Sequence, residues 1–159
     1  SLERARDLRQ PPVRVLAAAQ SIPAEVEVIS NYYHADLTVM PEAMGTARRI
    51  YQRSGLTPAD MQLAMLYDAF TPQVLKQLEG FGFCGRVEAK DFVRDGNIQL
   101  GGRLPVNTNG GLIGEAYIHG MNNITEAVRQ VRGTAVNQVP NVEHALVSCA
   151  MAGAILGRA

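Results

Sequence analysis

The sequence is poor in the residues that build metal sites and disulfide frameworks. It has only two cysteines, Cys84 and Cys149, which lie far apart and lack the spacing of metal ligands. The three histidines are scattered as well, so the sequence predicts no metal site. Cysteines used this sparingly favour a reducing environment, and we expect a cytoplasmic protein.

The sequence also lacks an excess of charge of either sign and long apolar runs. Fifteen basic residues balance 15 acidic ones without a basic run, which argues against binding to nucleic acid or an anionic membrane surface. No apolar run approaches the ~18 residues of a membrane-spanning helix. Hydrophobic residues make up 47% of the chain and charged residues 19%, which is typical of a folded α/β interior.

The length of 159 residues suits one domain with a substantial core. The chain begins inside an amphipathic helical pattern, SLERARDLRQ, without a methionine or a targeting sequence. We therefore expect a piece of a longer protein, namely the C-terminal part of a larger enzyme.

Short apolar segments alternate with helical patterns along the chain. Strands are expected at 13–18, 63–67, 144–149 and 154–156, and residues 25–33 read as an excursion over the sheet. Helices are expected from Pro41 to a stop at Gly55, over 72–82 behind a Thr71 cap, within 88–102, and from Glu115. This alternation predicts an α/β fold with a mixed, mainly parallel sheet covered by helices on both faces.

Residues 105–124, PVNTNGGLIGEAYIHGMNNI, are the most unusual stretch. Glycine adopts positive φ without steric cost, and a polar, glycine-rich loop that runs into a helix presents N–H groups to an anion or a polarised oxygen. The stretch predicts an active-site loop, with a glycine-rich turn packed beneath a helix as the alternative. The residues expected to contact substrate are Asn107, Asn109, Gly110, Gly111, Gly120 and Met121.

Three segments together resemble active-site segments of the C-terminal half of the thiolase superfamily. They are LYDAF at 66–70, NTNGGLIGEAYIHG at 107–120 and SCAMAG at 148–153, in the family's order. The family has an Asn-Glu-Ala-Phe or His-Asp-Cys-Phe strand end, a Gly-His-Pro loop and a Cys-x-Gly turn at these places. The resemblance implies that residues 1–12 end the N-terminal half or form a linker, and that 13–159 form a thiolase-like C-terminal domain.

Departures from the family pattern narrow the function that the resemblance implies. Tyr67 stands in place of the family's Asn or His, and Tyr117 stands in place of the loop His, with His119 two residues later. These positions hold a thioester enolate in thiolases, so two tyrosines make ordinary Claisen chemistry doubtful.

The Tyr-Ile-His-Gly-Met-Asn pattern resembles the lipid-transfer-protein group of thiolase-like enzymes, which act as aldolases on steroid side chains. The resemblance implies retro-aldol cleavage of a β-hydroxyacyl-CoA, such as a 17-hydroxysteroid side-chain thioester, to a ketone and a short acyl-CoA. It further implies a thiolase-like homodimer and a small partner built of a zinc ribbon and an OB-fold. No cofactor is expected, because coenzyme A arrives as part of the substrate.

The candidate catalytic residues are Tyr67, Tyr117, His119, Asp68 and Cys149. The tyrosines are assigned the proton transfers, without an order between them. His119 orients or acidifies a tyrosine, donates to the enolate oxygen, or only bonds to backbone. Asp68 positions a neighbour or ends the strand, and Cys149 either shuttles a proton, as the second cysteine does in thiolases, or is a small buried hydrophobe.

Two other functions remain open. An acyl-transferring thiolase would need a nucleophilic cysteine from the N-terminal half, and a non-catalytic lipid or acyl-CoA binding protein would need no proton transfer.

If both tyrosines transfer protons, Tyr67→Phe or Tyr117→Phe should lower the cleavage rate by ~10²–10⁴, the usual contribution of a positioned acid or base. Each change removes only a hydroxyl, so the melting temperature should change little. Steady-state kinetics with thermal melting checks this, and a variant with normal C–C cleavage excludes that tyrosine from the reaction.

Overall fold

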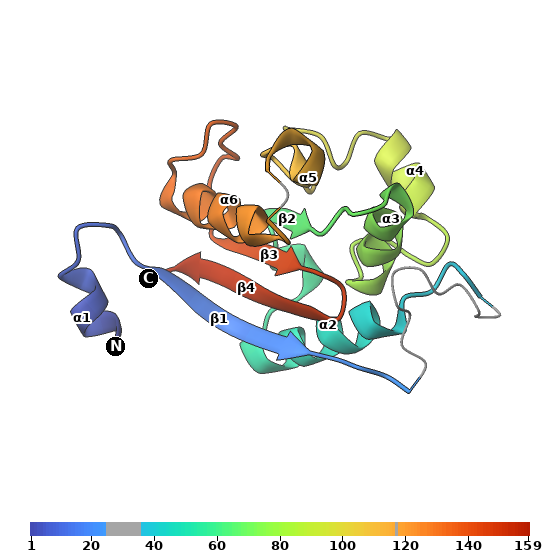
Figure 1. Cartoon of the computed structure of the whole chain (residues 1–159), viewed down its shortest axis with the longest axis horizontal. Coiled ribbons are helices and arrows are strands. Elements are labelled where there is room, and N and C mark those ends of the chain that lie inside the picture. Colours follow the sequence, from blue (N-terminus) through green and yellow to red (C-terminus); the bar gives the residue numbers. More distant parts are fainter. Residues whose placement is uncertain (25–35, 117) are drawn as a thin grey trace.

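A computed structural model describes residues 1–24, 36–116 and 118–159. The excursion predicted at 25–33 and the side chain of Tyr117 therefore lie outside the described residues. The described chain forms one layered unit, with a central sheet and helices packed on it (Figure 1).

The sheet has four strands in the order β1-β4-β3-β2. Their bounds are Val13–Gln20 for β1, Leu63–Leu66 for β2, His144–Ser148 for β3 and Ala152–Arg158 for β4. All four expected strands are present, with ends that differ by a few residues. β2 is buried along its whole length.

The prediction of a mainly parallel sheet is wrong, although the sheet is mixed. Only β2 and β3 pair in parallel, whereas β4 is antiparallel to both β3 and β1. The link between β3 and β4 is only residues 149–151, and a connection this short can join only antiparallel neighbours.

Helices cover both faces of the sheet, as predicted (Figure 1). On one face, α2 (Pro41–Ser54) packs its Ala43, Ala47 and Ile50 against the sheet, and α3 (Thr71–Gly80) and α4 (Ala89–Arg94) extend this core. On the other face, α6 (Met121–Arg132) packs Ala127 and Val131 against β2 and β3. Alternate residues of β2 enter the two cores, so this strand connects them.

Several helix boundaries differ from the predicted ones. The helix expected from Glu115 is instead a single turn, α5 (Gly111–Gly114), followed by α6 from Met121. The interruption has a backbone cause, because His119 and Gly120 have φ of +52° and +84°. Thr71 is the first residue of α3 rather than its cap, which is Phe70. The N-terminal helix α1 covers only Leu2–Arg6, and a 3₁₀ turn covers Pro58–Asp60.

The glycine-rich loop begins as an added edge beside β2. Val106 forms a parallel bridge with Ala64. The Asn107 side chain then continues the ladder, because its Oδ1 accepts from Leu66 N at 2.8 Å and its Nδ2 donates to Leu66 O at 2.9 Å. One amide side chain thus satisfies both backbone groups at the end of a buried strand.

Asn107→Ala should destabilise the fold, because it leaves both Leu66 backbone groups without a partner. Each buried unsatisfied group costs about 1–3 kcal/mol of unfolding free energy. Denaturant unfolding measures the loss. Asn141→Ala is the matched control, since exposed Asn141 also has a left-handed φ, +53° against +50° for Asn107. Equal losses in the two variants would contradict the ladder role of Asn107.

Candidate active site

Tyr67 follows β2 directly and is held by backbone bonds on two sides. Its N–H donates to Ser148 O at 2.8 Å, and its carbonyl accepts from the Gln77 side chain at 2.8 Å. Its ring lies close to Gly120, where an added Cβ would be 3.4 Å from the Tyr67 ring. The position of this tyrosine is therefore set by the sheet, by α3 and by the start of α6.

Cys149 occupies the tight turn between β3 and β4. Its N–H donates to Ala152 O, and its carbonyl accepts from Met151 N, both at 2.9 Å. Ala150, next in the turn, has a left-handed φ of +67°, which costs energy for a residue with a side chain. The Cys149 residue itself is exposed, so the prediction of a small buried hydrophobe does not apply.

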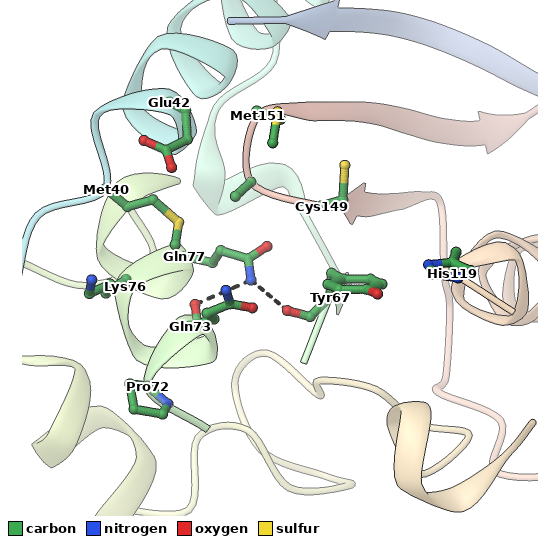
Figure 2. Close-up of a pocket in the computed structure, with 11 residues that line it drawn as sticks. Met40, Glu42, Tyr67, Pro72, Gln73, Lys76, Gln77, His119, Cys149 and Met151 are labelled. Atoms are coloured by element: carbon green, nitrogen blue, oxygen red, sulfur yellow. Dashed lines mark hydrogen bonds between the residues drawn. The ribbon is translucent and has the colours of Figure 1, made fainter. Parts of the chain in front are cut away.

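His119 reaches the same region from the start of α6. It is exposed and takes a left-handed backbone that non-glycine residues adopt only at a cost. Figure 2 shows the Tyr67 ring between α3 and His119, with Cys149 nearby in the β3–β4 turn. Two residues with left-handed backbone conformations, His119 and Ala150, thus border one site.

Tyr67, His119 and Cys149 line two cavities, of about 230 Å³ and 380 Å³, which meet at these three residues. The smaller cavity is bordered by polar side chains from α2 and α3, among them Glu42, Lys76 and Gln77 (Figure 2). The larger one has mainly apolar walls, which include Val15, Ile124, Val147, Ala154 and Leu156. Both cavities have mainly apolar walls, and the smaller one adds these polar and charged side chains, which suits a largely apolar ligand with a polar part.

Asp68 positions the glycine-rich loop. Its two carboxylate oxygens accept from Leu112 N at 3.2 and 3.3 Å. A Cβ added to Gly111 would lie 2.0 Å from Asp68 Oδ2, so the close approach requires glycine there. These contacts support the positioning role among the two predicted for Asp68.

The predicted substrate-contacting residues do not lie together. Gly120 lines the larger cavity beside Tyr67. Asn107, Asn109 and Gly110 border a separate open hollow, and their polar groups serve the loop, as in the Asn109 Oδ1 that accepts from Gly111 N. Gly111 is buried beside Asp68, and Met121 is exposed. For these five residues the role in substrate contact stays a prediction.

Sequence reasoning missed Glu42, Lys76, Gln77 and Asn123, which line the cavities. All four lie on helices, where a polar residue reads as part of the solvated face. The sequence did carry a signal for Asn123. The helical spacing of α6 places the asparagines of its MNNI start on the face that the helix buries.

Cys84 lies outside both cavities. Burial, followed by the nearby carboxylates of Glu79 and Glu88, raises the pKa of its thiol to about 11. Among the described residues, no cluster of three or more His, Cys, Asp or Glu could hold a metal ion. In that same part of the chain, no helix has the length and apolarity needed to cross a membrane.

A sheet with helices on both faces and a site at the β3–β4 turn agrees with the thiolase-like domain that the sequence motifs predict. Residues 24–157 match the family described as thiolase C-terminal domain-like. The chain belongs to this family, which confirms the predicted fold class.

Individual relatives show which proteins the chain resembles in sequence and structure. The chain is 55% identical over 99% of its length to a 17-hydroxy-3-oxo-4-pregnene-20-carboxyl-CoA lyase of Mycobacterium tuberculosis, and covers 42% of that protein. It is 52% identical to a steroid side-chain-cleaving aldolase of Thermomonospora curvata, over 99% of this chain and 41% of the relative. A solved Ltp2-ChsH2(DUF35) aldolase superposes with a TM-score of 0.93 at 52% identity, over 98% of this chain and 42% of that one. The chain thus spans about two fifths of these relatives.

The two cysteines should differ in reactivity toward iodoacetamide at pH 8. Exposed Cys149 should be alkylated first. Cys84 should react slowly, because its pKa of about 11 leaves only a small fraction of this thiol ionised at pH 8. The Cys84 rate should rise about tenfold per pH unit between pH 8 and 10, in proportion to its thiolate fraction. Peptide mass mapping of the Cys84→Ser and Cys149→Ser variants measures each rate separately. Equal rates at pH 8 would contradict this assignment.

Proposed function

We propose that this chain is the C-terminal half of an aldolase that cleaves a β-hydroxyacyl-CoA thioester, of the 17-hydroxysteroid side-chain class, to a ketone and a short acyl-CoA. The observation that carries the proposal is the position of Tyr67. It lines both cavities at the place where they meet, in a chain 55% identical to a steroid acyl-CoA lyase.

The reaction requires two proton transfers. A base takes the proton of the β-hydroxyl, the C–C bond breaks as the carbonyl of the ketone forms, and the electron pair passes into a thioester enolate. An acid then returns a proton to the enolate carbon. Tyr67 and Tyr117 are assigned these transfers, which suit a phenol whose pKa is lowered by hydrogen-bond donors or a nearby cation. His119 borders the same junction as Tyr67, which supports assigning it as a donor to the developing oxyanion.

The two cavities fit the two parts of such a substrate. The apolar walls of the larger cavity suit a fused hydrocarbon ring system, and the polar border of the smaller one suits the pantetheine arm of coenzyme A. Val15 in β1 is 64% exposed although it borders the apolar cavity, which supports a further wall supplied by another part of the assembly.

We assign this chain the partners that its resemblance implies, namely a zinc-ribbon and OB-fold protein and a second thiolase-like subunit. The solved aldolase that superposes on it is an Ltp2-ChsH2(DUF35) assembly, which supports a partner protein. Acyl transfer is the competing activity, because the chain is also 35% identical to a benzoylsuccinyl-CoA thiolase subunit of Thauera aromatica over 72% of its length.

The test is incubation of the full-length protein and its partner with a 17-hydroxysteroid β-hydroxyacyl-CoA, followed by mass spectrometry of the products. A 17-keto steroid and a short acyl-CoA in equal amounts are expected, without free coenzyme A as a co-substrate. Cleavage that depends on added coenzyme A and yields a new thioester would show thiolase activity instead. Saturable acyl-CoA binding without any product would show a carrier.

A further inference from the structure

The buried face of α6 is unusually polar. Its buried residues are Asn122, Asn123, Glu126, Ala127, Gln130 and Val131. Glu126 and Gln130 are satisfied, since Glu126 Oε1 accepts from Thr108 at 2.7 Å and from Gln130 at 2.9 Å. The side-chain amides of Asn122 and Asn123 are not satisfied in this way. Neither their oxygens nor their nitrogens have a hydrogen-bond partner among the described residues.

Asn123 is the one of these two that borders a cavity. It is 1% exposed and lines the apolar cavity together with His119 and Gly120. Asn122 is 3% exposed and is not among the described residues that line that cavity. A buried amide without partners costs free energy, and such a group calls for a ligand or water that satisfies it.

The position of Asn123 indicates the chemistry of that ligand. It lies in the first turn of the 12-residue helix α6, where the helix dipole favours negative charge. Its amide nitrogen is a donor. Both amide atoms are buried in this structure, so donation to a ligand in the cavity requires the side chain to rotate about χ1 or χ2. The fitting partner is an oxygen that bears partial negative charge at the head of an apolar group.

We propose that the Asn123 amide donates a hydrogen bond to the thioester oxygen of the substrate, which becomes the enolate oxygen during cleavage. This inference rests on the proposed aldolase function. His119, four residues earlier and just before α6, borders the same cavity and is the second donor that we assign to this oxygen. Charge grows on this oxygen as the C–C bond breaks, so the hydrogen bond strengthens in the transition state and raises kcat more than it lowers KM.

The kinetic test uses the full-length protein with its partner and three variants, Asn123→Leu, Asn123→Asp and the matched control Asn122→Leu. Both leucine variants replace a buried, unpartnered amide with an apolar group of similar size, so neither should lower the melting temperature. We expect kcat to fall ~10²-fold in Asn123→Leu with little change in KM, and to stay near wild type in Asn122→Leu. Asn123→Asp keeps the size but removes the donor, and should lose activity even if the leucine variant folds poorly. Wild-type kcat in a folded Asn123 variant, or equal losses at 122 and 123, overturns the proposal.

A binding test separates this inference from the proposed function. Calorimetry compares a non-cleavable acyl-CoA thioester, which lacks the β-hydroxyl, with the corresponding thioether, which lacks the carbonyl. Asn123→Leu should weaken thioester binding about 2- to 10-fold and leave thioether binding unchanged. Wild-type protein that binds the thioester through Asn123 but cleaves no β-hydroxyacyl-CoA would refute the aldolase alone. Equal effects on both ligands, or no binding of either, would refute the assignment of Asn123.

Discussion

The pairing of one asparagine side chain with one strand end determines where the rest of the site can lie. β2 is four residues long and buried on both faces, so its last backbone groups must be bonded within the protein. The Asn107 amide bonds to both groups of Leu66, and the chain then turns at a positive φ into the glycine-rich loop. Because Tyr67 directly follows β2, the same contact orders the loop and the candidate acid or base.

A second set of buried polar contacts fixes α6 relative to this loop. Thr108 bonds through its hydroxyl to Glu126 and Gln130, and its carbonyl accepts from Asn137 at 2.8 Å. Gln130 also accepts from Val139 N at 2.9 Å. Fully satisfied networks of this kind define a specific geometry, whereas an apolar contact would allow the helix to slide. His119 and Asn123, at the start of α6, are thereby held beside Tyr67 and the β3–β4 turn.

The sequence predicted correctly the features that depend on local residue patterns. Alternating and apolar runs located all four strands, and Pro41 and Gly55 bounded α2. Tyr67, His119 and Cys149, picked from motifs far apart in the chain, do meet at one junction. Strand direction was predicted wrongly, because an apolar pattern does not indicate which way a strand runs. The three-residue link between β3 and β4 does indicate it, since so short a link requires antiparallel strands. The dual role of Asn107 could not be predicted, since it depends on a contact 41 positions away.

The contact between Asp68 and Gly111 makes two positions interdependent. Any side chain at 111 would occupy the space of the Asp68 carboxylate, and any longer residue at 68 would displace the backbone of the loop. Neither position can change by itself without disturbing the other. Ile124, Val147 and Ala154 form walls of the apolar cavity and lie outside this contact, so substitutions there can reshape the cavity while Asp68 and Gly111 keep the loop in place.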